Sequence, residues 1–172
     1  MAKKPQLRVM KAEKFDPKKS LAKKSGWPKQ KLHISQLREE DFKTGDLRAY
    51  ALARDLGFAK ATGGLVEAHV NRRARPFNYE EVAKRHFHDI QFQMVYVLRG
   101  TARMEFEGYG EVEMRPGTAW IQPPGIKHTV LHFSDDYEIL EMIIPAVYDT
   151  YNLDEPPGGH KSRGRKKAGA RK

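Results

Sequence analysis

Two histidines at alternate positions, followed by a glutamine, form the first pattern in the sequence that could do chemistry. His86, His88 and Gln93 lie in the stretch RHFHDIQFQMVYVLRG. Residues i and i+2 of a β-strand point to the same face, about 6.6 Å apart at about 3.3 Å per residue. Two imidazoles so placed can converge on one metal ion. Gln93 has the parity of the valines that follow it, so we expect its strand to direct the amide into the same interior.

A third histidine, His128, follows the turn Pro123-Pro124-Gly125 and would enter the site from a different strand. His132 shares the parity of His128, but four residues span about 13 Å along a strand. We therefore expect His132 to lie further along the pocket or to pack, and not to bind the same ion.

The elements that must position these residues are short β-strands. We predict strands at 65–70, 93–98, 101–107, 111–115, 118–121, 127–133 and 137–144, separated by Gly, Pro and Asp turns. Segments 101–107 and 111–115 alternate with period two, which indicates one wet face. The residues expected inside are Met104, Phe106, Val112 and Met114; those expected outside include Arg103, Glu105, Glu111 and Glu113. A short helix capped by Ser35 and ending at Phe42, and a strand within 47–56, are expected upstream.

The two histidine-containing stretches resemble the two motifs of the cupin family. The first runs His-x-His, four residues, Gln, six residues, Gly, and ends at Gly100; the second runs from Gly117 through the Pro-Pro-Gly turn to His128. The match extends over about 77–144. Gln93 stands where the family usually has Glu, and His132 where it often has Asn.

This resemblance implies an all-β fold, a small cupin jelly-roll barrel (a double-stranded β-helix) that holds one divalent metal inside. The ligands it implies are His86, His88, Gln93 and His128. Such a set contains no anionic side chain, so a bound ion keeps its formal double charge. Imidazole nitrogen with a carbonyl oxygen suits Zn, Mn, Ni, Fe or Co. The set also differs from the 2-His-1-carboxylate arrangement usual for non-haem iron oxygenases.

A metal of undiminished charge is a strong Lewis acid, and we expect it to favour a small anionic, chelating ligand. The leading hypothesis is an isomerase or lyase acting on a carboxylate- or hydroxyl-bearing metabolite. Small cupins with this ligand pattern resemble those that act on uronate sugars, which suggests a sugar acid. Two alternatives stay open: a non-enzymatic ligand-binding or regulatory cupin, and an Fe(II) dioxygenase. Candidate pocket groups for acid–base work are His132, Tyr96, Tyr137 and Glu141, whereas His69 is interpreted as structural or exposed.

The charges of the chain are distributed unevenly. The chain has 172 residues and a net charge of +10, but residues 1–31 hold 11 Lys and Arg against two acidic residues, and 156–172 hold seven against none. Lys, Pro and Gly dominate both tails, which favours disorder. We expect one barrel domain at 32–155 between two disordered basic tails that could contact nucleic acid or another polyanion. The absence of Cys and of long apolar runs favours a cytoplasmic protein without a membrane segment.

The strand at 93–98 is apolar on both faces. Val95 and Val97 point one way, and Met94, Tyr96 and Leu98 point the other. One face fills the barrel, so the other needs a cover. Either the chain's own N-terminal segment or a second copy could supply it, and we expect a homodimer.

Overall fold

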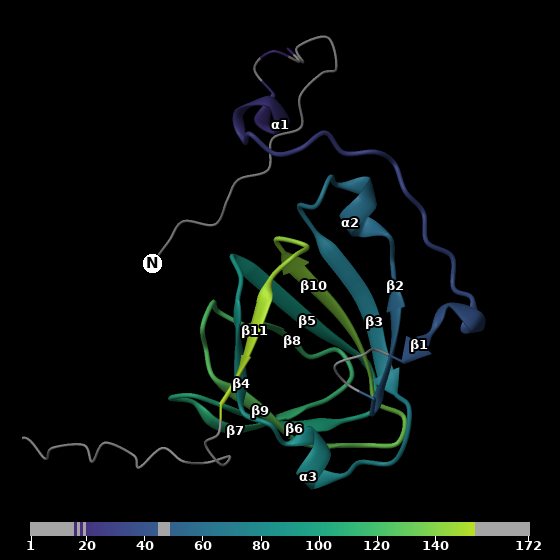
Figure 1. Ribbon diagram of the computed structural model, residues 1–172, viewed down its shortest axis with the longest axis vertical. Helices are drawn as coiled ribbons and strands as arrows, with labels where there is room; N and C mark the ends of the chain where they lie inside the picture. The colour runs from purple at the N-terminus through teal and green to yellow at the C-terminus, as the bar shows by residue number, and fades with distance from the viewer. Residues whose placement is uncertain (1–15, 17, 19, 45–48, 154–172) are drawn as a thin grey trace, which may run out of the picture.

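A computed structural model describes residues 16, 18, 20–44 and 49–153 (Figure 1). Two antiparallel sheets face each other and enclose the core. The first sheet contains β1 (Lys43–Thr44), β2 (Ala51–Asp55), β3 (Glu67–Arg73), β10 (Glu138–Ile144), β5 (Phe92–Arg99) and β8 (Ala119–Ile121), in that spatial order. The second contains β11 (Asp149–Asn152), β4 (His86–Asp89), β9 (His128–Phe133), β6 (Ala102–Phe106) and β7 (Gly110–Met114). Short helices α1 (Leu21–Lys24), α2 (Phe58–Ala61) and α3 (Tyr79–Val82) lie outside the sheets.

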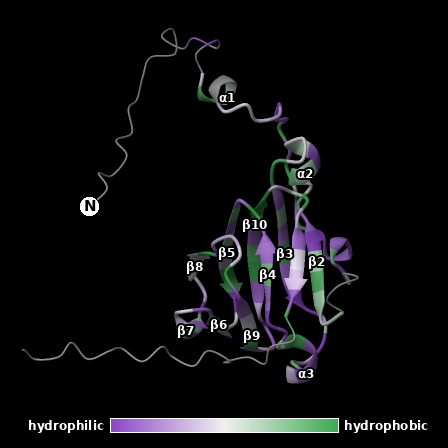
Figure 2. Cartoon of the chain, turned by 60° about the vertical axis from the view of Figure 1, so that its left-hand side comes forward, coloured by the Kyte–Doolittle hydropathy of each residue, from purple (hydrophilic) through white to green (hydrophobic). Residues whose placement is uncertain are grey.

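The connections between the sheets explain how distant motifs meet. From β3 onward the chain crosses repeatedly from one sheet to the other, with β6 and β7 as the hairpin that interrupts the alternation. This winding makes β4 and β9 neighbours, and His86 stands opposite His128 in their register. The predicted all-β jelly-roll fold is therefore confirmed, although β11 and α3 were not anticipated. Colours in Figure 2 change from residue to residue along the strands, as expected for sheets with one buried face.

One hydrophobic core fills the space between the sheets. Its buried members are Val82, Val97, Ala102, Met104, Phe106, Met114 and Phe133. Met104, Phe106 and Met114 thus point inward as predicted. Val112, expected beside them, is 39% exposed because it lies on the edge strand β7.

The expectation that Glu105 faces water was wrong. Its side chain is buried and pairs with Arg85, whose exposure is 1%. Glu105 on β6 stands opposite Thr129 on β9, and Arg85 immediately precedes β4. Because β9 separates β4 from β6, the arginine reaches across β9 to the carboxylate and covers what would otherwise be the wet face.

A second hydrophobic cluster covers part of the outer face of the six-stranded sheet. Buried Phe42, Leu56, Ala68 and Val70 form it, with Leu52, Phe58, Leu140 and Met142 packed against them. The helix predicted from Ser35 to Phe42 is replaced by an extended segment with one 3-10 turn at Glu39–Asp41. The Ser35 hydroxyl accepts a hydrogen bond from Arg54 Nη1 at 3.0 Å, and the Gln36 carbonyl accepts one at 3.2 Å. These bonds hold the segment on β2, and the Ser35 hydroxyl binds Arg54 instead of capping a helix.

The tail predictions lie mostly outside the described residues, which exclude 1–15, 17, 19, 45–48 and 154–172. Disorder of the tails and their contact with polyanions therefore stay predictions.

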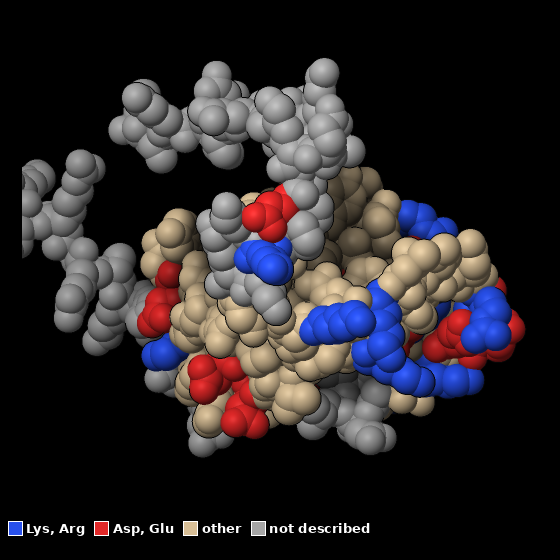
Figure 3. All heavy atoms as spheres, turned by 90° about the horizontal axis from the view of Figure 1, so that it is seen from above, with Lys and Arg blue, Asp and Glu red and all other residues tan. Residues whose placement is uncertain are grey.

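On the face shown in Figure 3, basic and acidic side chains lie near one another among uncharged residues. None of the helices in the described part of the chain is both long and apolar enough to span a membrane.

Candidate metal centre

Three imidazoles converge inside the barrel. His86 and His88 alternate on β4, and His128 begins β9. Each offers a ring nitrogen, and these three atoms lie within 4.8 Å of one another. The side chains are almost fully enclosed, with exposures of 6%, 6% and 3%. The spacing of two on one strand and the antiparallel register of the next therefore produce the convergence expected from the sequence.

Hydrogen bonds to the Nδ1 atoms fix the orientation of these three rings. His86 Nδ1 lies 2.8 Å from the Lys84 carbonyl, and His128 Nδ1 lies 3.1 Å from the Ile126 carbonyl. A carbonyl oxygen only accepts, so the proton of each ring sits on Nδ1 and the lone pair on Nε2. His88 Nδ1 contacts the Thr150 hydroxyl at 2.8 Å. Such bonds are the usual means by which proteins orient metal-binding histidines.

A second glutamine, Gln122, was not predicted as a site residue and joins two of the candidate ligands. The amide nitrogen of Gln122 lies 3.0 Å from Gln93 Oε1 and 3.1 Å from His128 Nε2. Its two N–H groups donate to both acceptors, so the lone pairs of Gln93 and His128 point at one small electropositive group. Gln122 follows Trp120 by two residues on the strand leading to the Pro-Pro-Gly turn, and this parity was the available signal.

This donor set fits a divalent metal ion. Three imidazole Nε2 atoms and the Gln93 carbonyl oxygen are ligands that first-row transition metals accept. Gln93 is 1% exposed and comes from β5, across the barrel from the β4 histidines.

A buried polar chain continues from Gln93 into the six-stranded sheet. The Gln93 amide nitrogen donates to Glu141 Oε1. The other carboxylate oxygen lies 2.9 Å from His69 Nε2 and 3.3 Å from Asn71 Nδ2. His69 stands directly opposite Glu141 in the β3–β10 register, and its Nδ1 lies 3.3 Å from Glu67. His69, interpreted from sequence as structural or exposed, is thus a largely buried member of this chain.

The pKa of His69 predicts a pH dependence of stability. Burial alone would lower this pKa, but the hydrogen bonds that the protonated ring donates to Glu141 and Glu67 outweigh burial and raise the pKa from 6.5 to about 10. A raised pKa stabilises the fold fully below pH 6.5, and the contribution is lost as the pH rises from 6.5 through 10. Chemical unfolding in chelator should show that wild type exceeds His69→Gln by a few kcal/mol at pH 6, with the difference shrinking toward pH 10. A constant difference would contradict the assignment.

The other predicted pocket groups are not brought to the ligands. Tyr96 lies on the outer face of β5 and is 39% exposed. His132 is exposed and packs on Phe77, with ring centroids 5.2 Å apart. Tyr137 stacks on Phe133 at the far end of the core, where burial raises the pKa of its phenol. Of the four candidates, Glu141 contacts the ligand set.

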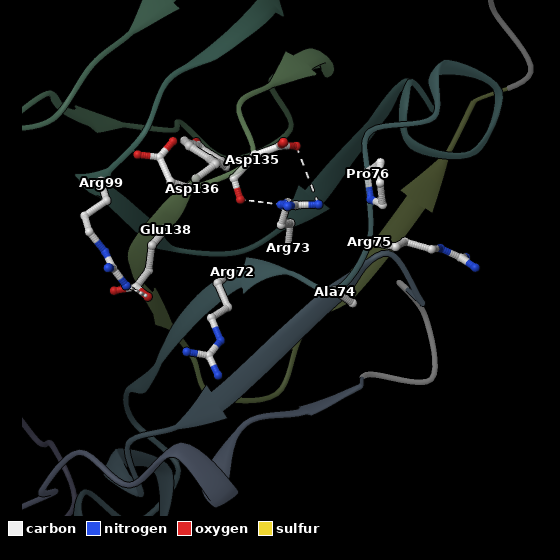
Figure 4. Close-up of a pocket in the computed structure, with 10 residues that line it drawn as sticks. Arg72, Arg73, Ala74, Arg75, Pro76, Arg99, Asp135, Asp136 and Glu138 are labelled. Carbon is white, nitrogen blue, oxygen red and sulfur yellow. Dashed lines mark hydrogen bonds and ion pairs between the residues drawn. The ribbon is translucent and has the colours of Figure 1, made fainter.

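A hollow on the surface gathers four arginines, and Figure 4 shows how they lie. Its volume is about 420 Å³. Arg73 lies against Asp135, and Arg99 pairs with Glu138 at 2.9 Å. Arg72 and Arg75 pair with Glu39 and Glu81. Because carboxylates neutralise each guanidinium, this hollow is not built to hold an anion.

The fold is a barrel of two antiparallel sheets, and three histidines inside it are placed to bind a metal ion. Residues 77–143 match the family model of the cupin domain. A comparison with curated proteins found no match.

Solved structures share this fold at low sequence identity. The polyketide cyclase RemF from Streptomyces resistomycificus is 20% identical, with a TM-score of 0.55 over 72% of this chain and 89% of that one. A sugar phosphate isomerase of the cupin superfamily from Silicibacter pomeroyi is 20% identical, with a TM-score of 0.51 over 74% and 83%. KdgF from a Halomonas species is 20% identical, with a TM-score of 0.50 over 64% and 94%. At this identity the likeness concerns the fold alone.

Proposed function

We propose that this protein is a metal-dependent isomerase or lyase for a small anionic metabolite, such as a sugar acid. The observation that carries the proposal is a cluster of three oriented imidazoles, one of which the Gln122 amide links to the neutral amide of Gln93. A divalent metal held by His86, His88, His128 and Gln93 would supply Lewis acidity toward a carbonyl, carboxylate or hydroxyl oxygen. We also propose a cytoplasmic location, in keeping with the absence of Cys.

The residues around the ligands supply orientation and a proton-handling group. Glu141 accepts from the Gln93 amide nitrogen, which turns the Gln93 carbonyl oxygen toward Gln122 and His128. The same carboxylate is paired with His69. A carboxylate and an imidazolium therefore lie together beside Gln93, one side chain away from the candidate metal centre. We propose that Glu141 moves the substrate proton and that the imidazolium of His69 holds the carboxylate in position.

The solved relatives are compatible with this proposal without choosing a substrate. Their names include a sugar phosphate isomerase and a polyketide cyclase, and each name concerns that protein. One fold hosts many reactions, so the choice of reaction rests on the site. The neutral ligand set and the absence of the 2-His-1-carboxylate pattern favour Lewis-acid chemistry over the Fe(II) dioxygenase alternative.

Substitution of Gln93 by glutamate tests the importance of the uncharged ligand. Gln93→Glu adds the carboxylate that the cupin motif usually carries, and Glu141→Gln in the same protein keeps the hydrogen bond between the two side chains. Metal should bind this double variant at least as tightly. The formal charge of the loaded site falls by one, and affinity for a small carboxylate probe such as citrate should fall roughly ten-fold. Titration calorimetry with metal-loaded protein measures both. Unchanged citrate affinity would show that site charge does not select the ligand.

Proton NMR of a substrate panel tests the activity. Metal-loaded protein is incubated with sugar acids, sugar phosphates and hydroxy acids, and Glu141→Gln and His128→Ala proteins serve as controls. The proposal predicts new resonances from one anionic class, lost in both variants. Binding without turnover would favour a ligand-binding cupin, and oxygen uptake with Fe(II) would favour a dioxygenase; either result would replace the proposal.

A further inference from the structure

The inward face of β3 carries polar side chains in the neighbourhood of the candidate metal centre. Ala68 and Val70 on this strand pack into the second hydrophobic cluster, outside the sheet. Alternation along the strand therefore turns Glu67, His69 and Asn71 toward the interior, and these three residues are here called the polar row. Polar groups at interior positions cost free energy unless they find hydrogen-bond partners.

Solvent reaches the polar row although it faces inward. The side chains of Glu67 and His69 are 31% and 12% exposed. On β5, two strands away in the same sheet, the inward-facing Val95 and Val97 are 2% and 0% exposed. The interior is therefore open at β3 and filled at β5, and a small molecule that enters the barrel meets the polar row.

The strand register places the polar row beside the candidate metal ligands. Ile143 on β10 stands opposite both Glu67 on β3 and Gln93 on β5, so these two side chains lie level across the sheet (Figure 1). At about 4.8 Å per strand, their backbones are about 10 Å apart. In the other direction, Phe106 stands opposite His128 and is buried in the hydrophobic core. A ligand bound at the centre therefore extends toward β3.

The polar row offers hydrogen-bond acceptors to such a ligand. Glu67 Oε1 lies 3.3 Å from His69 Nδ1, and Asn71 Nδ2 donates to Glu141 Oε2 at 3.3 Å. Within the residues that the structure describes, no hydrogen bond uses Glu67 Oε2 or Asn71 Oδ1. Both oxygens are acceptors, so they suit the hydroxyl groups of a sugar.

The same row is unfavourable for a second anionic group. Glu67 and Glu141 carry two negative charges, against one positive charge on the imidazolium of His69 that lies between them. Whichever anionic group of a ligand the metal holds, another anionic group at the far end of that ligand would meet this excess of negative charge. Like charges at such short range repel each other and lower the affinity.

We propose that the polar row is the subsite for the hydroxyl-bearing end of the ligand, and that it selects sugar acids with one anionic group over sugar phosphates and other dianions. The inference rests on the proposed function, because it takes the metal to hold the one anionic group. Glu67 and Asn71 accept hydrogen bonds from hydroxyl groups, and His69 holds the Glu67 carboxylate in position. Glu67 is thus a specificity-determining residue outside the metal ligand set.

Titration calorimetry with gluconate and phosphogluconate tests the selectivity of the zinc-loaded protein. The probes share a carboxylate and a hydroxyl chain, and phosphogluconate adds a phosphate at the far end. Wild type should bind gluconate at least about ten-fold more tightly. Glu67→Gln removes one charge and keeps an acceptor oxygen, so affinity for phosphogluconate should rise roughly five-fold, while affinity for gluconate changes by less than about two-fold.

Glu113→Gln is the matched control for the loss of one negative charge. It changes an exposed carboxylate of β7 that pairs with Arg115, and the ratio of the two affinities should stay at the wild-type value. A merely structural role of Glu67 would move both affinities together. Equal affinities in wild type, no binding of either probe, or a ratio that Glu67→Gln leaves unchanged would overturn the subsite. Selective binding of gluconate without turnover of any substrate would instead refute the isomerase or lyase activity and leave the subsite standing.

Discussion

His128→Ala protein should contain almost no metal after purification from metal-supplemented medium. His128 is the candidate ligand on β9, and the centroid of its ring lies 4.2 Å from that of the His86 ring. Loss of one of three imidazoles should weaken metal binding by at least about 100-fold, more than loss of an orienting partner does. Elemental analysis of untagged protein measures the content, and His86→Ala should behave alike.

His132→Ala is the matched control for that loss. It removes an imidazole from the same strand, but one that is exposed and packs on Phe77. Its metal content should equal that of the wild type. Full occupancy in His128→Ala protein, or equal losses in His128→Ala and His132→Ala, would contradict the ligand assignment.

The second large effect is expected from Glu105→Ala. This change removes the carboxylate that pairs with the buried guanidinium of Arg85 and that Thr129 also contacts at 3.4 Å. Breaking a buried pair from one side costs about 3–5 kcal/mol, because a charge remains without its partner in a low-dielectric interior. For a chain of this size the melting temperature should fall by roughly 10 °C. Urea unfolding of the metal-free protein measures the free energy.

Two further variants show whether the burial of the pair explains the cost. Glu113→Ala removes a carboxylate from an exposed pair with Arg115 and should change stability by less than about 1 kcal/mol. Arg85→Met/Glu105→Leu replaces both buried charges and should recover most of the lost stability. A loss in the double variant as large as in Glu105→Ala would mean that shape, and not charge, determines the effect.

The period of a β-strand explains why much of the candidate site was predictable. Alternation places His86 with His88 on one face and aligns Gln93 with Val95 and Val97, and the structure has all three of these polar groups buried. Single-strand parity is a local property, so the sequence carries it. The register between β4 and β9, which places His86 against His128, was available only through the resemblance of the motifs.

Contacts between distant strands explain what the sequence could not supply. His69 and Glu141 are 72 positions apart and meet because β3 pairs with β10. Gln122 reaches Gln93 because β8 lies beside β5, and its parity with Trp120 was the one local signal of its burial. Glu105 was assigned to water by alternation alone, which ignores the arginine that crosses β9. The prediction of a helix at 35–42 was wrong for a similar reason, because Arg54 binds the residues that would have capped it.

Anomalous diffraction from crystals of the metal-loaded protein tests the central claim most directly. Data collected on both sides of the absorption edge of the bound metal locate it without reference to activity. We predict one peak per chain, about 2.0–2.2 Å from the Nε2 atoms of His86, His88 and His128 and within ligand distance of Gln93 Oε1. A peak elsewhere, or none between these histidines in fully loaded protein, would contradict the proposed metal centre.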